Sequence, residues 1–470
     1  MSRSVAVIGG GLAGITAALR CADGGARVTL FEGKPRLGGL THSFKRGDLD
    51  VDNGQHVFLR CCTSYLGLID RLGVRAGVTL QRRLAIPIVS PGRDRVWLRR
   101  DALPAPAHLA RSLFGYTPLS VAERLRFITA ALALRRVDLD APATDGQSFG
   151  AWLTAHGQSR RAIETMWDLV GIATLNAKAG DASLALAAKV FQTGLLTKAS
   201  AADIGWSVVP LGELHGTAGR RALAAAGVEV LTSVKVSSVR RGDVDWRIEG
   251  RSFDQVISAV PPEVAARILP PGALPPGGEL GTSPIVNLHV VYDREVLDEP
   301  FVAAIDSPLQ WVFDRTVQSG LDKSGLGKSG LGKSGLGAGG QYIAVSLSAA
   351  DDLIDVPVAD LRARMLPALE ALLPAARGAE VRDFFVTRER HATFRAAPGT
   401  APLRPPAATA FPGLWLAGAW TATGWPATME GAVRSGDSAA AGVLDLPGAG
   451  RAASGSAIST GMSTLDGVAP

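Results

Sequence analysis

The residues best suited to chemistry in this 470-residue chain are glycines that follow an apolar run, Val5–Ile8, near the N-terminus. Their spacing is typical of a dinucleotide site, in which the first glycine permits a tight turn and the second lets the backbone approach the pyrophosphate. The third lets the following helix pack closely on the sheet, with the pyrophosphate at the helix N-terminus. We therefore expect the dinucleotide to contact Gly9, Gly11, Leu12, Ala13 and Gly14.

An acidic residue and a second glycine-rich segment sharpen this prediction. Glu32 ends a predicted strand that begins at Arg27, where its carboxylate can accept hydrogen bonds from the adenosine ribose and repel a 2′-phosphate. Some four hundred positions later, residues 414–418 and 428–436 read as another strand, loop and helix. Two such units at opposite ends of the chain indicate one cofactor held by both, which favours a flavin and redox chemistry.

The loop after Glu32 carries Arg36, whose guanidinium can pair with phosphate oxygens, and Gly38-Gly39, which permit close backbone approach. In these residues the sequence resembles the flavoprotein superfamily of amine oxidases, phytoene desaturases and squalene-associated desaturases. There, Glu-x-x-x-Arg-x-Gly-Gly continues the FAD site, and the match at Glu32, Arg36, Gly38 and Gly39 is complete. The resemblance implies FAD in a Rossmann-like domain of an α/β fold, with an interleaved α+β substrate domain. Because no cysteine follows Cys62, we expect the flavin to be noncovalent.

Four further segments, 52–56, 209–216, 258–262 and 420–431, resemble the hydroxysqualene dehydroxylase branch of that superfamily. The resemblance implies reductive removal of the hydroxyl of hydroxysqualene to give squalene, a step toward hopanoids or other C30 terpenoids. It also implies that the backbone of a strand around Val236 contacts the adenine. The remaining expected FAD contacts are Gly54, Gln55, His56, Gly418, Ala419, Thr428 and Met429.

One departure from the superfamily concerns the C-terminal loop. Gly418-Ala419 stands where Gly-Asp is common, so a carboxylate that usually bonds the ribityl or phosphate region is missing. FAD would then depend more on backbone amides. Glu430 is either its replacement or a helix cap or solvated residue, and the sequence leaves both open.

The domain organisation is expected to be discontinuous. The segment 76–205 is rich in Ala, Leu and Arg with few strand signals, whereas 266–390 contains alternating stretches that suit a mixed sheet beside the substrate. Short Gly/Ser repeats predict a flexible insertion at 318–340, and composition predicts a disordered tail at 446–470. The FAD-binding domain is predicted from 1–75, 206–265 and 391–445, and the substrate domain from 76–205 and 266–390.

Composition and charge limit the other classes. The three cysteines, Cys21, Cys61 and Cys62, suggest neither a disulfide framework nor a metal site, so we expect a reducing cytoplasm and no metal. We see no secretory signal and no spanning helix. Despite a net charge of +6, no nucleic-acid motif is present. Residues 109–136 mix apolar side chains with arginines, which fits either a peripheral contact with the inner membrane face or a helix covering the substrate domain.

Reductive dehydroxylation needs an acid for the departing oxygen and an environment that tolerates an allylic cation. His56 is the first candidate acid, although it could instead bond backbone or flavin; Asp168, Asp203 and Glu164 are further candidates. Alternative functions are an oxidative flavoenzyme, either a polyene desaturase or an amine oxidase, and a noncatalytic isoprenoid-binding protein. Aromatic faces that could stabilise the cation are those of Trp206, Trp311, Trp420 and Trp425.

Overall fold

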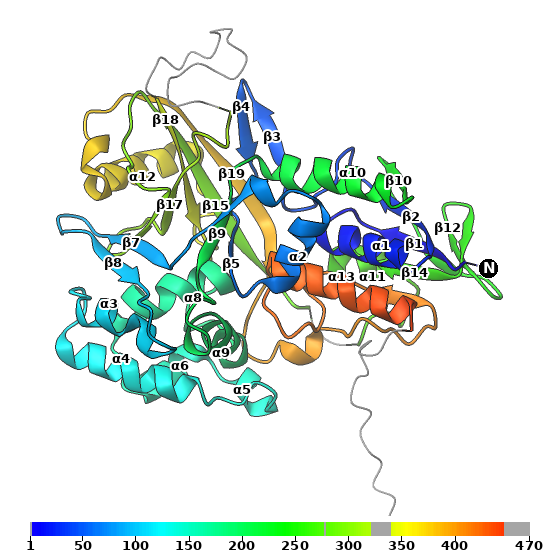
Figure 1. Cartoon of the computed structure of the whole chain (residues 1–470), viewed down its shortest axis with the longest axis horizontal. Coiled ribbons are helices and arrows are strands. Elements are labelled where there is room, and N and C mark those ends of the chain that lie inside the picture. Colours follow the sequence, from blue (N-terminus) through cyan, green and yellow to red (C-terminus); the bar gives the residue numbers. More distant parts are fainter. Residues whose placement is uncertain (1, 277–278, 321–339, 446–470) are drawn as a thin grey trace, which may run out of the picture.

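The computed structural model describes residues 2–276, 279–320 and 340–445 (Figure 1). The predicted tail, 446–470, and most of the predicted insertion lie outside these residues. The start of that insertion, however, was placed too early. Gln318 and Ser319 are buried, and the Ser319 carbonyl accepts a hydrogen bond from the backbone of Asp50. These two residues pack against the fold because their polar groups find partners there.

A five-stranded parallel sheet confirms the predicted α/β class. Its central strands are buried on both faces, which explains their uninterrupted apolar sequences. From β1 the chain builds outward in one direction and later resumes on the other side, so the order reverses between β1 and β14. Ligands bind at the carboxyl ends of strands at such a point. In spatial order the strands are β10 (Glu229–Thr232), β2 (Arg27–Glu32), β1 (Ser4–Ile8), β14 (Gln255–Ser258) and β20 (Leu414–Leu416).

Helices from both ends of the chain pack beside this sheet. Figure 1 shows α1 (Leu12–Asp23), in blue, alongside α13 (Met429–Val443), in orange-red. Their backbones approach so closely at Gly436 that a Cβ there would lie 2.3 Å from the carbonyl oxygen of Ala13. Glycine at 436 therefore lets the two ends of the chain form one unit. The neighbouring helices are α2 (Thr63–Arg71), α10 (Ala218–Ala225) and α11 (Pro262–Ile268).

The second large sheet is mixed and has seven strands. Only β16 and β7 pair in parallel; the other neighbours are antiparallel. Helix α12 (Val358–Leu372) packs Leu361, Met365 and Leu369 into a common core with this sheet. In spatial order the strands are β19 (Val381–Phe394), β15 (Thr282–Tyr292), β18 (Gln341–Leu347), β17 (Trp311–Asp314), β16 (Phe301–Ala304), β7 (Ala85–Val89) and β8 (Val96–Arg99).

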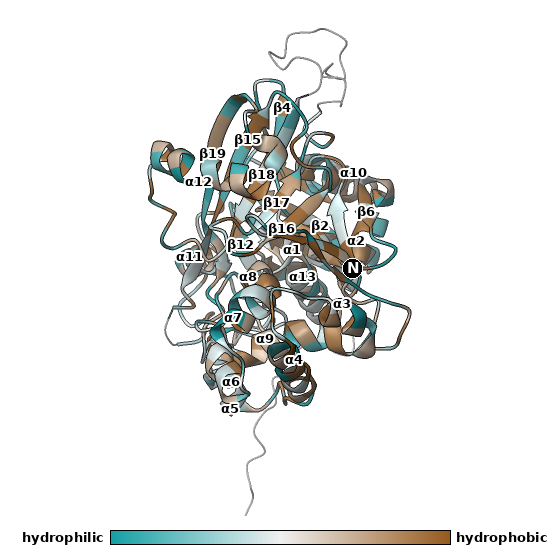
Figure 2. Ribbon diagram, turned by 90° about the vertical axis from the view of Figure 1, so that its left-hand side faces the viewer, coloured by the Kyte–Doolittle hydropathy of each residue, from teal (hydrophilic) through white to brown (hydrophobic). Residues whose placement is uncertain are grey.

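The segment 76–205 contributes more strand than its sequence suggested, because β7 and β8 extend the mixed sheet. These strands are short, and Pro87 lies inside β7, where proline weakens the strand signal. Apart from β6 (Val78–Leu80) and the start of β9 (Ile204–Ser207), the rest of the segment is mostly helical, and these helices form the lower part of the molecule in Figures 1 and 2. Its helices are α3 (Ala110–Phe114), α4 (Val121–Leu134), α5 (Pro142–Gly146), α6 (Phe149–Ala155), α7 (Arg160–Ala162), α8 (Asp168–Leu175) and α9 (Leu184–Phe191).

Three small sheets lie outside the two large ones. The strand predicted to continue to Val236 ends at Thr232, and Val236 lies in a segment without ladder pairing, because Ser233 has a positive φ of 60°. None of the described helices has the length and apolarity needed to cross a membrane. The small sheets comprise β3 (Ser43–Arg46) with β4 (Leu49–Asp52), β5 (Val57–Leu59) and β6 (Val78–Leu80) with β9 (Ile204–Ser207), and β11 (Arg240–Arg241), β12 (Trp246–Ile248) and β13 (Arg251–Phe253).

Candidate functional site

The turn between β1 and α1 is formed by glycines with different requirements. Gly9 has a φ of 108°, in a region that favours glycine. A Cβ at Gly14 would lie 1.8 Å from the Gly9 carbonyl oxygen, so no side chain fits there. At Gly11, by contrast, a Cβ would meet only the Gly39 Cα, at an ordinary 3.7 Å. The protein itself therefore demands glycine at positions 9 and 14 but leaves space beside position 11.

That space fits a phosphate-bearing cofactor. Gly11 is the N-cap of α1 and offers no capping side chain, so the first backbone amides of the helix lack a side-chain acceptor. Leu12 and Ala13 are the first residues of this helix. Free amides and the positive end of the helix dipole together suit the anionic pyrophosphate predicted here. The chain thus has room and hydrogen-bond donors where the sequence predicts the cofactor.

The end of β2 is held by its acid. Glu32 accepts hydrogen bonds from the Gly10 amide and the Lys34 amide, both at 2.7 Å. A carboxylate has further lone pairs, so this fixed group can still accept hydrogen bonds from a ribose. Arg36 is half-buried and makes no ion pair within the described residues. Burial lowers its pKa, while the nearby Glu32 opposes that shift, and its guanidinium remains available to phosphate.

The paired glycines after Arg36 bring their loop onto the turn. Gly38 and Gly39 have φ values of 105° and 57°. A Cβ on Gly39 would lie 2.9 Å from the Gly11 Cα, and the Gly38 amide donates to the Gly10 carbonyl at 2.8 Å. The structure therefore brings the two predicted glycine segments together at the carboxyl edge of the parallel sheet.

The loop 53–56, between β4 and β5, contacts the mixed sheet. Asn287, fully buried in β15, donates from Nδ2 to the Asn53 carbonyl at 3.3 Å. Among the described residues, neither Asn287 Oδ1 nor Gln55 Nε2 has a hydrogen-bond partner, although both atoms are buried. Unpaired buried polar atoms usually meet a ligand or water. Asn287, which sequence reasoning missed because it is one polar residue in an apolar strand, is therefore a candidate site residue.

His56 lies in the same loop with a defined tautomer. Its Nδ1 is 3.1 Å from the Gly54 carbonyl, which can only accept, so Nδ1 carries a proton and Nε2 can accept one. Burial lowers the pKa of His56, partly opposed by this hydrogen bond and by Asp52. The ring is therefore neutral at pH 7, and it becomes a proton donor at Nε2 only after taking up a proton.

A second histidine on a neighbouring segment was not predicted as a site residue. His215 lies in the π-helical turn Gly212–Thr217, a feature often found at functional sites. Its Nε2 is 2.9 Å from the hydroxyl of Tyr65. Burial lowers the pKa of His215 to about 3, with a further lowering from His56 when that ring is protonated. The environment therefore keeps both rings neutral at pH 7. The only sequence signal for His215 was its place in segment 209–216.

The candidate carboxylic acids lie in contrasting environments. Burial raises the pKa of Asp168 to about 6, opposed by the Ala179 amide at 2.8 Å. Asp203 is fully buried, but hydrogen bonds from Arg100 and Arg60 outweigh burial and lower its pKa. Glu164 forms a surface ion pair with Arg160. Between Asp168 and Asp203, Asp168 is the carboxyl group whose environment raises its pKa.

The C-terminal loop and α13 complete the edge. Gly418 follows β20 with a φ of 134°, and Thr428 caps α13 by accepting from the Gly431 amide at 3.1 Å, just before Met429. Glu430 is buried and caps a different helix, α2. It accepts from the amides of Ser64 and Tyr65 and from Arg434. Because these bonds occupy its oxygens, the cap interpretation is favoured over replacement of the missing acid.

Aromatic side chains line the mixed sheet near the loop 53–56. Trp206 pairs with Val57, the residue after His56, and its ring lies 5.6 Å from that of Phe301. Phe301 in turn lies 6.0 Å from Trp311, and Trp311 stacks on Phe313 at 6.3 Å. We call Trp206, Phe301, Trp311 and Phe313 the aromatic wall.

The other two predicted tryptophans are already engaged. The indole of Trp420 donates to the Val260 carbonyl at 3.1 Å. The ring of Trp425 has two cations over it, Lys189 Nζ at 5.4 Å and the Arg434 guanidinium at 4.8 Å from the ring centre. Only Trp206 and Trp311 therefore lie in the aromatic wall, beside one another through Phe301.

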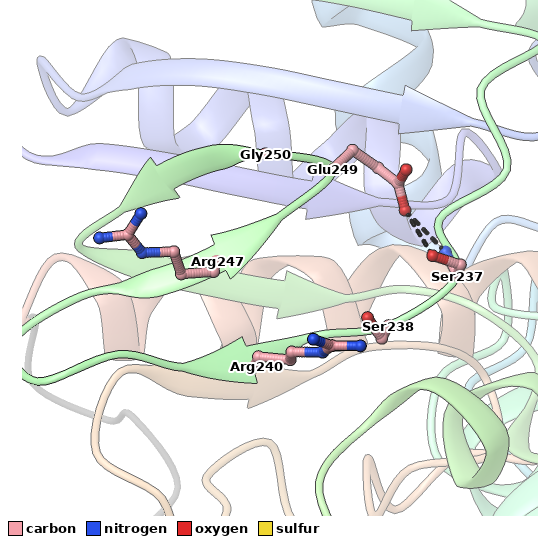
Figure 3. Close-up of a pocket in the computed structure, with 6 residues that line it drawn as sticks. All are labelled: Ser237, Ser238, Arg240, Arg247, Glu249 and Gly250. Carbon is pink, nitrogen blue, oxygen red and sulfur yellow. Dashed lines mark hydrogen bonds between the residues drawn. The ribbon is translucent and has the colours of Figure 1, made fainter.

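Two surface hollows lie outside the aromatic wall. One, of about 340 Å³ and shown in Figure 3, lies on the β11–β13 sheet and is lined by Ser237, Ser238, Arg240, Arg247, Glu249 and Gly250. The Ser237 hydroxyl and amide both bond Glu249 there. The other, of about 650 Å³, lies beside Arg36, Ser43 and Gly216. The lining of the first hollow is polar, whereas the second mixes apolar side chains, among them Leu37 and Phe44, with charged ones. Within the described residues, no cluster of His, Cys, Asp or Glu suits a metal ion.

The family model for flavin containing amine oxidoreductase matches residues 12–444. The chain belongs to this family. FAD is the cofactor of this flavin oxidoreductase, and the chain is an FAD-dependent oxidoreductase. It is 28% identical to hydroxysqualene dehydroxylase of Rhodopseudomonas palustris over 96% of the chain and 100% of that protein. It is also 24% identical to zeta-carotene desaturase of Synechocystis, over 94% and 97% of the two chains.

Solved structures agree on the fold of the flavin oxidoreductase. Cyclohexylamine oxidase from Brevibacterium oxydans superposes with a TM-score of 0.68 and 18% identity, over 95% of this chain and 99% of that one. An oxidoreductase from Methanosarcina mazei gives 0.66 at 17% identity, over 93% and 99%. These likenesses establish a shared architecture, and the substrate has to be argued from the site.

Proposed function

We propose that this flavin oxidoreductase converts hydroxysqualene to squalene by reductive removal of the hydroxyl. The observation that carries the proposal is near full-length similarity to hydroxysqualene dehydroxylases, including that of Sinorhizobium fredii, 28% identical over 94% of this chain and 98% of that protein. The aromatic wall supports it, because the partly buried rings of Trp206 and Trp311 pack on the buried Phe301, and Trp206 pairs with Val57, next to His56. Such rings suit a hydrocarbon and a transient cation.

The proposed FAD site combines the segments described above. Helix α1 and the glycine turns receive the phosphates, Glu32 the ribose, and the ends of β20 and α13 the flavin portion. We further propose the discontinuous domain division given by the sequence, with the parallel sheet in the cofactor domain and the mixed sheet in the substrate domain. The proposed FAD-contacting residues are Gly9, Gly11, Leu12, Ala13, Gly14, Glu32, Arg36, Gly38, Gly39, Gly54, Gln55, His56, Val236, Gly418, Ala419, Thr428 and Met429.

In the proposed reaction an allylic alcohol, a proton and a hydride give a hydrocarbon and water. Reduced FAD supplies the hydride when bound. His56, once protonated, donates from Nε2 to the departing oxygen while Nδ1 stays bonded to the Gly54 carbonyl. The carbon–oxygen bonding pair leaves with the oxygen as water, and the aromatic wall stabilises the cation until the new C–H bond forms. Asp168 is the second candidate acid because burial raises its pKa.

A polyene desaturase is the second candidate function, favoured by the similarity to zeta-carotene desaturases. A desaturase would run electrons from substrate to FAD, so the two functions differ in direction. The test is anaerobic single turnover of the purified holoenzyme, reduced with dithionite and mixed with hydroxysqualene. We expect flavin reoxidation with stoichiometric squalene by mass spectrometry. Reduction of the oxidised enzyme by a polyene, without squalene formation from hydroxysqualene, would instead establish the desaturase.

We propose that the enzyme is cytoplasmic and contacts the inner membrane face through α3, α4 and the loop between them. Phe114, Val121 and Leu125 are 59%, 64% and 51% exposed, an unusual cost for apolar side chains in water. Arg111 and Arg126 are exposed on the same segment and complement anionic headgroups. A membrane contact would also give a C30 hydrocarbon a route that avoids water.

Vesicle flotation tests this contact. We expect the protein to float with vesicles containing phosphatidylglycerol and to bind phosphatidylcholine vesicles weakly. The double change Phe114→Ser with Leu125→Ser should lower binding about tenfold or more. Burying each of these side chains in the membrane contributes about 1.5 kcal/mol or more to binding. Val244→Ser is the control, since Val244 is 96% exposed but lies in the turn before β12. Equal flotation of all three proteins would contradict the proposed surface.

A further inference from the structure

A buried arginine organises the loop that follows β20. Arg404 is 7% exposed, and Phe394 lies against its guanidinium at 4.6 Å. Its Nη2 donates to the carbonyl oxygens of Thr421 at 2.6 Å and Trp425 at 2.8 Å. Longer contacts run from Nη2 to the Ala419 carbonyl at 3.2 Å and the Thr423 hydroxyl at 3.4 Å, and from Nε to the Trp420 carbonyl at 3.4 Å.

These partners share one property: they are uncharged oxygens of the loop 418–425. Arg404 forms no salt bridge with any described carboxylate. Burial lowers its pKa to about 10, a shift that the charge of Asp145 opposes, so it remains charged at neutral pH. A buried charge without an ionic partner is costly unless several hydrogen bonds satisfy it. Here those bonds converge on a loop of eight residues, which indicates that the loop conformation depends on this one side chain.

Holding the carbonyls also orients the amides. In a planar trans peptide the N–H points opposite to the C=O. The Gly418 carbonyl accepts from the amide and hydroxyl of Thr421, and the Ala419 carbonyl faces Arg404. The amides of Ala419 and Trp420, which belong to these two peptides, are therefore directed away from Arg404 and Thr421. Neither amide has an acceptor among the described residues, whereas the Ala422 amide bonds the Pro405 carbonyl at 2.8 Å.

These free amides lie at the predicted cofactor edge, where FAD oxygens could accept their hydrogen bonds. The loop begins at the carboxyl end of β20, and the Trp420 indole ties it to Val260, just beyond β14. It is also the place where the superfamily's Gly-Asp is Gly418-Ala419 in this chain. Glu430, the nearby acid, is engaged in capping α2. The unpaired main-chain amides of Ala419 and Trp420 are therefore candidate donors to FAD oxygens.

We propose that Arg404 is a positioning residue for FAD: by holding the carbonyls of the loop 418–425, it presents the amides of Ala419 and Trp420 to an oxygen of the bound cofactor. The inference rests on FAD being the cofactor and is independent of the substrate. It predicts that oriented backbone donors of this loop, with the guanidinium behind them, contribute to FAD binding. Removal of Arg404 should weaken cofactor binding more than it weakens the fold.

The test compares Arg404→Met and Arg404→Lys with the wild-type protein. For each we would measure FAD affinity by titrating the apoprotein and following flavin fluorescence, and the melting temperature of the apoprotein. Arg404→Met should lower FAD affinity about tenfold or more, as expected for loss of oriented hydrogen bonds in a buried site. Arg404→Lys keeps the charge but loses the planar fork, so its affinity should fall between the two.

The matched control is Arg124→Met. Arg124 also holds main-chain carbonyls, those of Phe114, Leu119 and Ser120, but in the helical part of the chain. We expect this variant to lose some thermal stability and to keep wild-type FAD affinity. Wild-type affinity in both Arg404 variants would overturn the proposal.

Hydrogen exchange supplies a readout that a general loss of stability would not reproduce. With saturating FAD, peptides covering residues 418–425 should become protected in the wild-type protein. In Arg404→Lys, which guards against failure of the methionine variant to fold, this FAD-dependent protection should be reduced while that of α1 persists. Unchanged protection of residues 418–425 in a folded Arg404→Lys protein would contradict the inference.

Discussion

Asp52 and Arg315 form a buried ion pair between the β3–β4 hairpin and the end of β17, with side chains only 3% and 8% exposed. Asp52 also accepts hydrogen bonds from the Ser43 hydroxyl and the Leu211 amide. Because Asp52 immediately precedes the loop 53–56, this pair couples the mixed sheet to the segment that carries His56. The position of the candidate acid thus depends on an ion pair with a distant part of the chain.

Breaking this pair should be strongly destabilising. Asp52→Asn leaves the Arg315 charge buried without its partner, which typically costs about 3–5 kcal/mol. Asp50→Asn is the control, because Asp50 pairs with Lys45 at the surface, where a loss below about 1 kcal/mol is expected. Denaturant unfolding of both variants would measure the difference. Similar losses in the two would show that the buried pair has no special role.

The glycines of the first turn should separate folding from cofactor binding. Gly14→Ala places a Cβ against the Gly9 carbonyl, so we expect a poorly folded protein. Gly11→Ala meets no close protein atom, and its apoprotein should melt near the wild-type temperature. FAD affinity should nevertheless fall about tenfold or more, because the methyl group occupies the space for the phosphates. Calorimetry of the apoproteins and FAD titration provide the comparison. Wild-type FAD affinity in Gly11→Ala would contradict the assignment of the phosphates to the space beside Gly11.

His56 should control the pH dependence of the reaction. His56→Asn can keep the hydrogen bond to the Gly54 carbonyl but cannot carry the proton, so single-turnover reduction should slow about a hundredfold. Because burial lowers the pKa of His56 below 6.5, the wild-type rate should rise as pH falls toward that pKa. The variant should lack this dependence. A wild-type pH profile in His56→Asn would direct attention to Asp168.

Asp168 should make the protein less stable at high pH. Its folded pKa of about 6 lies above the ordinary 3.8, so the folded state loses stability as pH rises between these values and stays less stable above them. Asp168→Asn keeps an acceptor for the Ala179 amide and removes the charge. We expect about 1 kcal/mol more stability at pH 8, less than the full shift because the side chain is part-buried, and none below pH 4. Unfolding midpoints at the two pH values measure this, and a variant less stable at pH 8 would refute it.

Local sequence signals accounted for the cofactor class and the parallel sheet. Strand β1, helix α1 and Glu32 lie within 29 consecutive residues, from 4 to 32. The apolar strand, the glycine spacing and the acid could therefore be recognised together as one motif. The same locality identified the family through the segment ending at Gly39. By contrast, Pro87 obscured β7, and the strand predicted through Val236 stopped at Thr232 because the chain turns at Ser233.

What the sequence alone determined is therefore the FAD-dependent oxidoreductase and its α/β fold, since these depend on short-range patterns that tight phosphate contacts impose. Only the tertiary structure decided which groups surround the candidate chemistry. The Arg315 that holds Asp52, the Asn287 that meets Asn53, and the Arg404 that shapes the loop 418–425 come from distant or intervening strands and loops. Burial and pairing arise from contacts between such segments, and no local period encodes them.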